Sequence, residues 1–224
     1  MVALVFPALP TVTLPVTGRN ERFPVRRIFC VGRNYAEHAR EMGNDDKEPP
    51  FFFTKPADAV VESGSRIPYP PATNNFHHEG ELVLAIGKAG VMVSEADAPA
   101  MIWGHAAGND LTRRDLQAEA KAARRPWDMA KGFDKSAVVG AIRPGQLPDA
   151  ALRCTVNGAI RQEARLSDMI WSPAAIIAAL SQMVSLSPGD LIFTGTPAGV
   201  GPLNRGDTCK VEIDGLQSAT VTIA

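Results

Sequence analysis

Short apolar runs bounded by turn-forming residues recur along nearly the whole chain of 224 residues. Each run is about the length of one β-strand, and Gly, Pro, Asn or Asp ends it before a helix-length segment can form. The fifth run carries Asn157-Gly158, a strong hairpin signal. The chain is therefore expected to fold as a β-rich α+β protein. The runs that predict strands are residues 26–32, 50–56, 81–87, 135–142, 152–162, 190–197, 208–215 and 218–224.

Helices are expected in only three segments. Residues 94–108 begin at Ser94 as a helix cap, and residues 112–125 are rich in alanine and charged side chains. Residues 172–190 place a serine at the N-cap and a proline at the first helical position. Two polar stretches marked by Gly and Pro predict irregular structure. They are a loop at residues 40–50 and tight turns at residues 195–207.

Composition narrows the class of protein. Apolar residues make up 45% of the chain and charged residues 21%, which is typical of a folded domain, and no linker or repeat divides it. The formal net charge of -1 argues against nucleic acid as a partner. The N-terminal segment lacks a basic start and contains prolines, so it does not resemble a signal peptide. No segment approaches the roughly 18 apolar residues of a membrane span. We expect a soluble cytoplasmic protein.

The cysteines are few and scattered. Cys30, Cys154 and Cys209 are odd in number and show no CxxC spacing. This pattern predicts reduced, mostly buried thiols and gives no sign of a disulfide framework or a zinc site.

Two acidic residues open one of the predicted strands. Glu79 and Glu81 lie two apart, so on a strand their side chains share one face and repel each other. A positive group is expected beside them, either Arg or Lys or a metal ion. Asp110 is a third candidate, and three carboxylates without cysteine suit a hard cation such as Mg²⁺ or Mn²⁺. The neighbouring histidines, His77 and His78, are candidates to support a ligand. The alternative is a solvated acidic strand edge.

Several motifs together resemble the fumarylacetoacetate hydrolase family, in their order along the chain. They are VGRNYAEHAREMG, FFFTKPADAVV, HHEGELVLAIG, GNDLTRRDLQ, AKGFDKSAVVG and LIFTGTPAGVGPLNRGD. The resemblance extends from about Arg27 to the C-terminus. The short length is similar to the small single-domain members that act on acylpyruvates. The motifs look closest to fumarylpyruvate hydrolases of gentisate and naphthalene catabolism.

The resemblance implies a fold, an assembly and a metal. The fold is the mixed β-roll of the family's C-terminal domain, as a single domain over residues 1–224 with residues 1–26 packed on it as an N-terminal extension. The assembly is a homodimer. The metal is Mg²⁺ or Mn²⁺, with Ca²⁺ as a substitute in crystals, and the ligands that the family pattern implies are Glu79, Glu81 and Asp110.

The resemblance also implies the reaction, which is hydrolysis of a carbon–carbon bond in a 1,3-diketo acid such as 3-fumarylpyruvate, giving fumarate and pyruvate. His38 and Glu41 share one face of a helical turn, so Glu41 can orient His38 to take a proton from water. In similar enzymes this pair lies on a lid. Lys131 is expected to stabilise the oxyanion, with Lys135 as a weaker candidate. Outside the resemblance, such residues are more often ordinary surface charges.

Four residues are expected to hold the substrate. Arg114 and Gln117, on or near a helical face shared with Asp110, suit the far carboxylate of a fumaryl group, and Arg33 is an alternative. Arg113 is a further alternative. The hydroxyl of Thr196 and nearby backbone N–H groups are expected to hold the pyruvyl carboxylate.

Two other functions stay open from the sequence. One shares the fold and the metal: an oxaloacetate decarboxylase, or another isomerase or hydratase that forms an enolate. The other is a non-catalytic β-rich binding module with a structural Ca²⁺ site. We expect no nucleic-acid or membrane partner in any of these cases.

Overall fold

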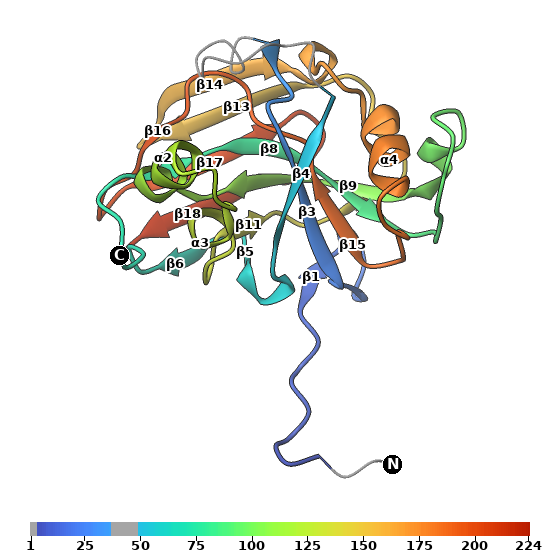
Figure 1. Ribbon diagram of the computed structural model, residues 1–224, viewed down its shortest axis with the longest axis horizontal. Coiled ribbons are helices and arrows are strands. Elements are labelled where there is room, and N and C mark those ends of the chain that lie inside the picture. Colours follow the sequence, from blue (N-terminus) through green and yellow to red (C-terminus); the bar gives the residue numbers. More distant parts are fainter. Residues whose placement is uncertain (1–3, 37–48) are drawn as a thin grey trace.

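β-Strands make up most of the structure, a computed structural model that describes residues 4–36 and 49–224 (Figure 1). All eight runs expected to form strands do so, and Asn157 and Gly158 turn the hairpin with φ angles of 52° and 81°. The strands are β1 (Thr13–Pro15), β2 (Arg22–Pro24), β3 (Arg27–Gly32), β4 (Phe51–Lys55), β5 (Val60–Glu62), β6 (Ser65–Ile67), β7 (Phe76–His78), β8 (Gly80–Ile86), β9 (Ile102–Asp110), β10 (Thr112–Arg113), β11 (Ala137–Val139), β12 (Arg143–Pro144), β13 (Ala151–Val156), β14 (Ala159–Arg165), β15 (Asp190–Phe193), β16 (Gly201–Pro202), β17 (Thr208–Ile213) and β18 (Ala219–Ile223).

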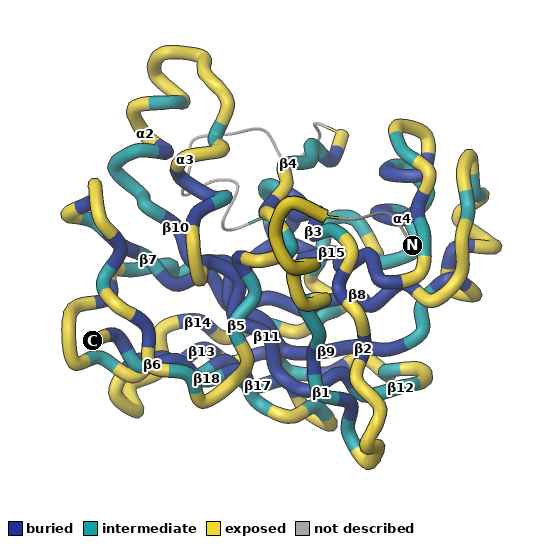
Figure 2. Tube along the Cα trace, turned by 90° about the horizontal axis from the view of Figure 1, so that it is seen from below, coloured by how far each residue is buried: buried dark blue, intermediate teal, exposed yellow. Residues whose placement is uncertain are grey.

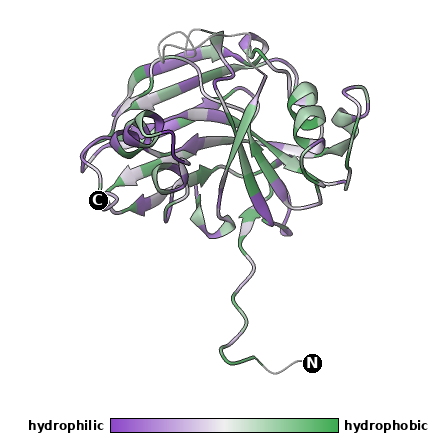
Figure 3. Cartoon of the chain, in the orientation of Figure 1, coloured by the Kyte–Doolittle hydropathy of each residue, from purple (hydrophilic) through white to green (hydrophobic). Residues whose placement is uncertain are grey.

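The helices are short and lie outside the sheets. Figure 1 shows α2 (Arg114–Ala122) and α3 (Asp128–Lys131) on one side of the molecule and α4 (Pro173–Ser181) on the other. Figure 3 shows that α4 is apolar and α2 largely polar, and α4 packs Ile176 and Ile177 into the core. Single 3₁₀ turns are η1 (Ala57–Ala59), η2 (Ala98–Met101) and η3 (Leu166–Asp168).

Two large sheets organise the described residues. The larger has the order β4-β3-β15-β8-β9-β11-β5, with β12 paired to β9, and mixes parallel and antiparallel neighbours. The smaller has the order β14-β13-β17-β18-β6. Two minor sheets are β1-β2 and β10-β7-β16. This architecture is the mixed β-roll that the sequence predicted.

β8 lies in the middle of the larger sheet and is buried on both faces, which explains its unbroken apolar run (Figure 2). Leu82 and Leu84 pack into the core that the smaller sheet covers. Val83 and Ala85 pack into a second core on the other face, which β1 and β2 help to close. The two faces of β8 therefore point into different surroundings.

One predicted helix is wrong. Residues 94–108 form only the turn η2 and most of β9, a nine-residue strand between β8 and β11. Gly104 and Gly108 lie within it, where an added Cβ would come within 2.6 Å of the Arg143 carbonyl oxygen and 2.5 Å of a Val83 methyl. These glycines let neighbouring strands approach closely and disfavour a helix.

The other two helices form, but they are shorter than expected. The predicted segment 112–125 contains α2, and 172–190 contains α4. Ser172 caps α4 as predicted, because its side chain accepts the Ala175 N–H at 3.1 Å. The helices of the described residues are too short or too polar to span a bilayer.

The N-terminal segment divides into a packed part and an exposed part. Leu14 and Phe23, on β1 and β2, belong to the second core. Residues 4–10 extend away from the body in Figure 1, and Val5, Phe6 and Leu9 are 92%, 78% and 90% exposed.

Candidate active site

The three predicted acidic ligands meet at one end of β8 and β9. Glu79 lies between β7 and β8, Glu81 lies on β8, and Asp110 ends β9. The two strands are antiparallel, with Gly80 opposite Asn109, and the Asp110 N–H donates to the Glu79 carbonyl at 2.8 Å. Carboxylate oxygens of all three residues lie within 4.8 Å of one another, and all three side chains are buried. The alternative of a solvated acidic strand edge is therefore wrong.

Positive side chains surround the carboxylates, as their mutual repulsion required. The ammonium of Lys131, at the end of α3, lies 2.7 Å from Glu79 Oε2 and 2.8 Å from Asp110 Oδ2. Lys55, at the end of β4, places its ammonium 2.7 Å from Asp110 Oδ1. Arg114, which starts α2, pairs with Glu79 Oε1. Burial would lower the pKa of Lys131, but Asp110 and Glu79 outweigh it and raise that pKa.

Glu81 differs from its two neighbours, because none of the described basic residues pairs with it. Its Oε2 accepts the Gly195 N–H at 2.7 Å. Gly195 has a φ of 96°, a left-handed conformation that favours glycine and directs this N–H at the carboxylate. Burial, with the charges of Asp110 and Glu79, raises the pKa of Glu81 well above its ordinary value.

These features fit a divalent cation. Asp110 Oδ1 is buried, and its contact is the ion pair with the Lys55 ammonium at 2.7 Å, without a hydrogen bond of good geometry. Glu81 brings a third carboxylate that lacks an ion pair among the described residues. Three oxygen ligands suit Mg²⁺, Mn²⁺ or Ca²⁺, and a bound cation would also relieve the repulsion that raises the pKa of Glu81.

A cavity of about 520 Å³ opens onto the carboxylates. Phe53 and Trp127 form an aromatic wall of the cavity, and their ring centres lie 5.8 Å apart. Glu79, Glu81 and Lys131 line the cavity. It is also lined by all four residues expected to hold substrate, namely Arg33, Arg114, Gln117 and Thr196. Lys121, on α2, adds a further basic side chain to the lining.

The substrate candidates are already engaged with protein groups. Arg114 donates to Gln117 Oε1 and, at 3.3 Å, to His77 Nδ1, besides its pair with Glu79. The shared helical face with Asp110 is wrong, because Asp110 ends β9 and only Arg114 and Gln117 lie on α2. The two residues still face the carboxylates because β10 turns the chain back over them.

The hydroxyl of Thr196 already makes two hydrogen bonds within the protein. It donates to the Gly80 carbonyl at 2.9 Å and accepts Gln162 Nε2 at 2.7 Å. The hydroxyl proton of Thr196 is therefore not available to a substrate carboxylate. The residue instead stabilises the turn that borders the cavity.

Two competing candidates lie away from the cavity. Lys135 is exposed, and the guanidinium of Arg113 lies 4.3 Å from the ring centre of Phe133. Neither lines the cavity.

His77 contacts Glu79 through Arg114, and burial together with the Arg114 charge lowers the pKa of His77 to about 4. His38 and Glu41 lie outside the described residues.

Three buried residues at the site were not among those expected from the sequence. Lys55 pairs with Asp110, and the side chain of Asn109 accepts the Glu79 N–H at 2.9 Å. Gln162 accepts the Gly80 N–H at 2.9 Å. Lys55 stands in the motif FFFTKPADAVV, so its position in the motif was a usable signal. Asn109 precedes Asp110 directly, but Gln162 lies on the distant strand β14 and only the fold brings it here.

Comparison with known proteins identifies the relationship. Residues 27–224 match the family model for the C-terminal domain of fumarylacetoacetate (FAA) hydrolase. The chain belongs to this family. Together with the similarity to fumarylpyruvate hydrolases described next, this membership indicates an enzyme that hydrolyses carbon–carbon bonds.

Individual relatives are similar over most of their length. A fumarylpyruvate hydrolase of Ralstonia sp. is 45% identical over 179 residues, which cover 79% of this chain and 93% of the relative. The mitochondrial oxaloacetate tautomerase FAHD1 of Mus musculus is 43% identical over 197 residues, covering 86% and 89%. The crystal structure of a Pseudomonas aeruginosa fumarylpyruvate hydrolase in complex with Mn²⁺ and pyruvate is 46% identical, with a TM-score of 0.96 over 99% of both chains.

Substitution of each glutamate by glutamine should separate the two acidic roles. Glu79→Gln removes the carboxylate that pairs with Arg114 and one of the two that pair with Lys131, so it should lower the free energy of unfolding of metal-free protein by about 3 kcal/mol. Glu81→Gln replaces a buried carboxyl group without an ion pair among the described residues by a neutral amide, and should raise the free energy of unfolding at neutral pH. Both variants should lose at least about tenfold in Mn²⁺ affinity.

Urea unfolding and Mn²⁺ titration followed by electron paramagnetic resonance measure the two effects. Arg113→Gln, which changes a charge outside the cavity, is the control for Mn²⁺ affinity. Unchanged Mn²⁺ affinity in Glu81→Gln would show that Glu81 is not a ligand.

Proposed function

We propose that this enzyme hydrolyses an acylpyruvate, with 3-fumarylpyruvate as the favoured substrate, in aromatic catabolism of the gentisate or naphthalene type. The products would be fumarate and pyruvate. The observation that carries the proposal is the buried carboxylate set Glu79, Glu81 and Asp110, of which Glu79 and Glu81 line a cavity that Arg33, Arg114 and Lys121 also line. The similarity to fumarylpyruvate hydrolases supports the choice of acyl group.

Glu79, Glu81 and Asp110 are proposed to hold Mg²⁺, with Mn²⁺ as an alternative. When bound, the cation supplies Lewis-acid stabilisation for the negative charge that develops on the pyruvyl oxygens. Asn109 and Gly195 hold the ligands in place, because they fix the Glu79 backbone and the Glu81 carboxylate. Such outer contacts orient metal ligands and exclude other arrangements.

Lys131 is proposed as the catalytic cation of the cavity. Its ammonium is buried between Glu79 and Asp110 and also lines the cavity, so it stays charged beside the reacting carbonyl. A fixed positive charge in a site of low polarity stabilises an oxyanion without any reorganisation of solvent. An ammonium at this place can also deliver a proton to the departing carbon, with Lys55 beside Asp110 retaining a positive charge there.

The basic lining suits a substrate with two carboxylates. Arg33 lies over the ring of Phe51 at 5.1 Å, an arrangement that keeps its guanidinium at the cavity. Arg114 and Lys121 are on α2, two turns apart on the cavity wall. Guanidinium groups bind carboxylates through two parallel hydrogen bonds. The fumaryl carboxylate is proposed to bind among these side chains, with Gln117 as a further donor.

His38 and Glu41 are proposed to activate the attacking water. Glu41 orients the imidazole, and His38 removes the proton, as in similar enzymes that carry this pair on a lid. Hydrolysis needs such a base, whereas proton transfer within oxaloacetate does not need a water molecule to attack carbon.

A second candidate function is supported by the mouse relative, which is an oxaloacetate tautomerase. Oxaloacetate also carries two carboxylates and forms an enol at the same position as an acylpyruvate. An oxaloacetate tautomerase or decarboxylase would use the same carboxylates and the same basic lining, so the two functions separate only in the assay.

A substrate panel tests the proposal. Fumarylpyruvate, maleylpyruvate, acetylpyruvate and oxaloacetate are offered to Mg²⁺-loaded enzyme, with loss of enol absorbance and release of pyruvate both recorded. We expect fumarylpyruvate to give the highest kcat/KM, and removal of metal by a chelator to abolish turnover until Mg²⁺ or Mn²⁺ is restored. The hydrolase proposal fails if oxaloacetate is consumed while none of the acylpyruvates is cleaved, or if the chelated enzyme keeps its full rate.

The role of the water-activating pair has its own test. His38→Ala should lower kcat for hydrolysis by about 10²- to 10⁴-fold, because a general base contributes about that much. Mn²⁺ affinity should stay unchanged, since the ligands are elsewhere. His105→Ala, which removes a histidine outside the cavity lining, is the control. Hydrolysis at the normal rate in His38→Ala would exclude this residue as the base.

A homodimer is part of the same proposal. The resemblance to the family implies it, and the exposed apolar side chains of residues 4–10 offer surface for a second copy. Light scattering on purified enzyme should give twice the mass of one chain. Deletion of residues 1–10 should weaken the association, and a strictly monomeric full-length protein would contradict the proposal.

A further inference from the structure

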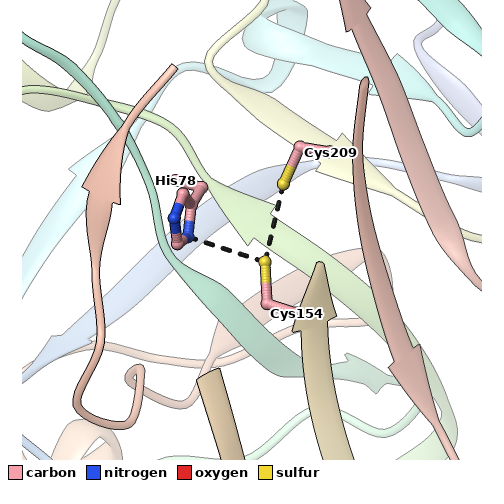
Figure 4. A group of neighbouring side chains, drawn as sticks. All are labelled: His78, Cys154 and Cys209. Carbon is pink, nitrogen blue, oxygen red and sulfur yellow. Dashed lines mark hydrogen bonds between the residues drawn. The ribbon is translucent and has the colours of Figure 1, made fainter. Parts of the chain in front are cut away.

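Figure 4 shows three potential metal ligands, His78, Cys154 and Cys209, that lie close together. Cys154 lies beside Gly80, the residue between the two glutamates. Cys154 lies on β13, Cys209 on β17 and His78 at the end of β7. Cys154 Sγ is 3.5 Å from Cys209 Sγ and 3.5 Å from His78 Nδ1. All three side chains are buried, and the structure has no disulfide between the two thiols.

The spacing matches that of ligands around one ion. In a tetrahedral zinc site with Zn–S near 2.3 Å and Zn–N near 2.0–2.1 Å, neighbouring ligand atoms lie about 3.5–3.8 Å apart. The distances around Cys154 fall at the lower end of this range, so a small expansion admits an ion. Two thiolates and a neutral imidazole around a divalent ion carry no net charge, which suits a buried site.

We propose that His78, Cys154 and Cys209 form a second metal site, selective for a thiophilic divalent ion such as Zn²⁺ or Cd²⁺. The two thiol protons leave as the ion binds, so each ion releases two protons. Soft sulfur ligands distinguish this site from the all-oxygen carboxylate site, which suits Mg²⁺ or Mn²⁺.

Two buried amides connect the second site to the carboxylate strand. Gln162 Nε2 donates to the Pro197 carbonyl at 2.8 Å, which orients Oε1 toward the Gly80 N–H and His78 Nδ1. In this arrangement Nδ1 carries the imidazole proton and donates to Gln162. Asn109 accepts the Glu79 N–H and donates to Cys209 Sγ at 3.3 Å.

An ion bound at His78 Nδ1 replaces the proton on that nitrogen, and the proton moves to Nε2. The hydrogen bond from His78 to Gln162 is then lost. The Gly80 N–H donates to the same Gln162 Oε1 at 2.9 Å, so a displacement of the Gln162 side chain changes a hydrogen bond of the Gly80 backbone. We therefore expect occupancy of the second site to disturb the backbone that carries Glu79 and Glu81. Coupling of this kind is reciprocal between the two sites.

Cadmium binding to Mg²⁺-loaded protein tests the proposal, with a phosphine reductant keeping the thiols reduced. The thiolate-to-cadmium charge-transfer absorbance should rise and saturate at one Cd²⁺ per chain. Cys154→Ser and Cys209→Ser should each reduce its amplitude by at least half. Cys30→Ser, which changes a buried cysteine outside the cluster, should leave it intact. The absence of such absorbance in folded wild-type protein, or an unchanged amplitude in folded Cys209→Ser, would overturn the site.

A measurement on the wild-type protein covers the case in which a serine variant does not fold. X-ray absorption at the zinc edge, with one Zn²⁺ added per Mg²⁺-loaded chain, should show two sulfur atoms near 2.3 Å. A shell of oxygen and nitrogen alone would overturn the proposal. Amide resonances of Glu79 and Gly80 should shift on Cd²⁺ addition in the wild-type protein and in Cys30→Ser. Their failure to shift at full occupancy would overturn the coupling between the sites.

Discussion

The burial of three carboxylates against buried cations is the interaction on which this site depends. Removing a carboxylate from water is unfavourable unless charge and hydrogen bonds compensate it. Glu79 and Asp110 share the ammonium of Lys131, and Lys55 and Arg114 complete the compensation. Because those cations come from β4, α2 and α3, the charge pairing also fixes where the surrounding elements dock. Glu81 is the exception, with no basic partner among the described residues, and this makes the cluster receptive to a further positive charge.

β8 positions the site because its two faces contact different parts of the protein. On one face Glu79 and Glu81 point to Lys131 and the cavity, while on the other Gly80 packs against Cys154 and Val211 of the smaller sheet. A side chain at residue 80 would collide with that sheet, so the E-G-E pattern reflects packing behind the strand as well as chemistry in front of it. The acidic ligands are buried, and hydrogen bonds from the fold hold the Glu79 backbone and the Glu81 carboxylate, which favours a preorganised site.

The sequence predicted much of this because local patterns encode it. Short apolar runs bounded by turn residues indicated the strands, the Ser172-Pro173 start indicated α4, and the E-x-E spacing placed two carboxylates on one face. The errors and omissions have a common physical cause, since each depends on contacts between distant segments. Residues 102–108 form a central strand because glycines admit neighbouring backbones, whatever their local preference. Cys154, Cys209 and His78 are far apart in sequence, and only the pairing of β13 with β17, under the end of β7, brings them together.

Charge balance connects the metal with the substrate. Three carboxylates face Lys55, Lys131 and Arg114, so the cluster is close to neutral by itself. A divalent cation then leaves two positive charges in a buried place, and a substrate with two carboxylates restores neutrality. This argument favours dianionic keto acids, and by charge alone it fits both of the proposed substrates, fumarylpyruvate and oxaloacetate. Discrimination between hydrolysis and tautomerisation must therefore come from uncharged features of the site: the shape of the wall that Trp127 and Phe53 form, and the presence of a base that can activate water.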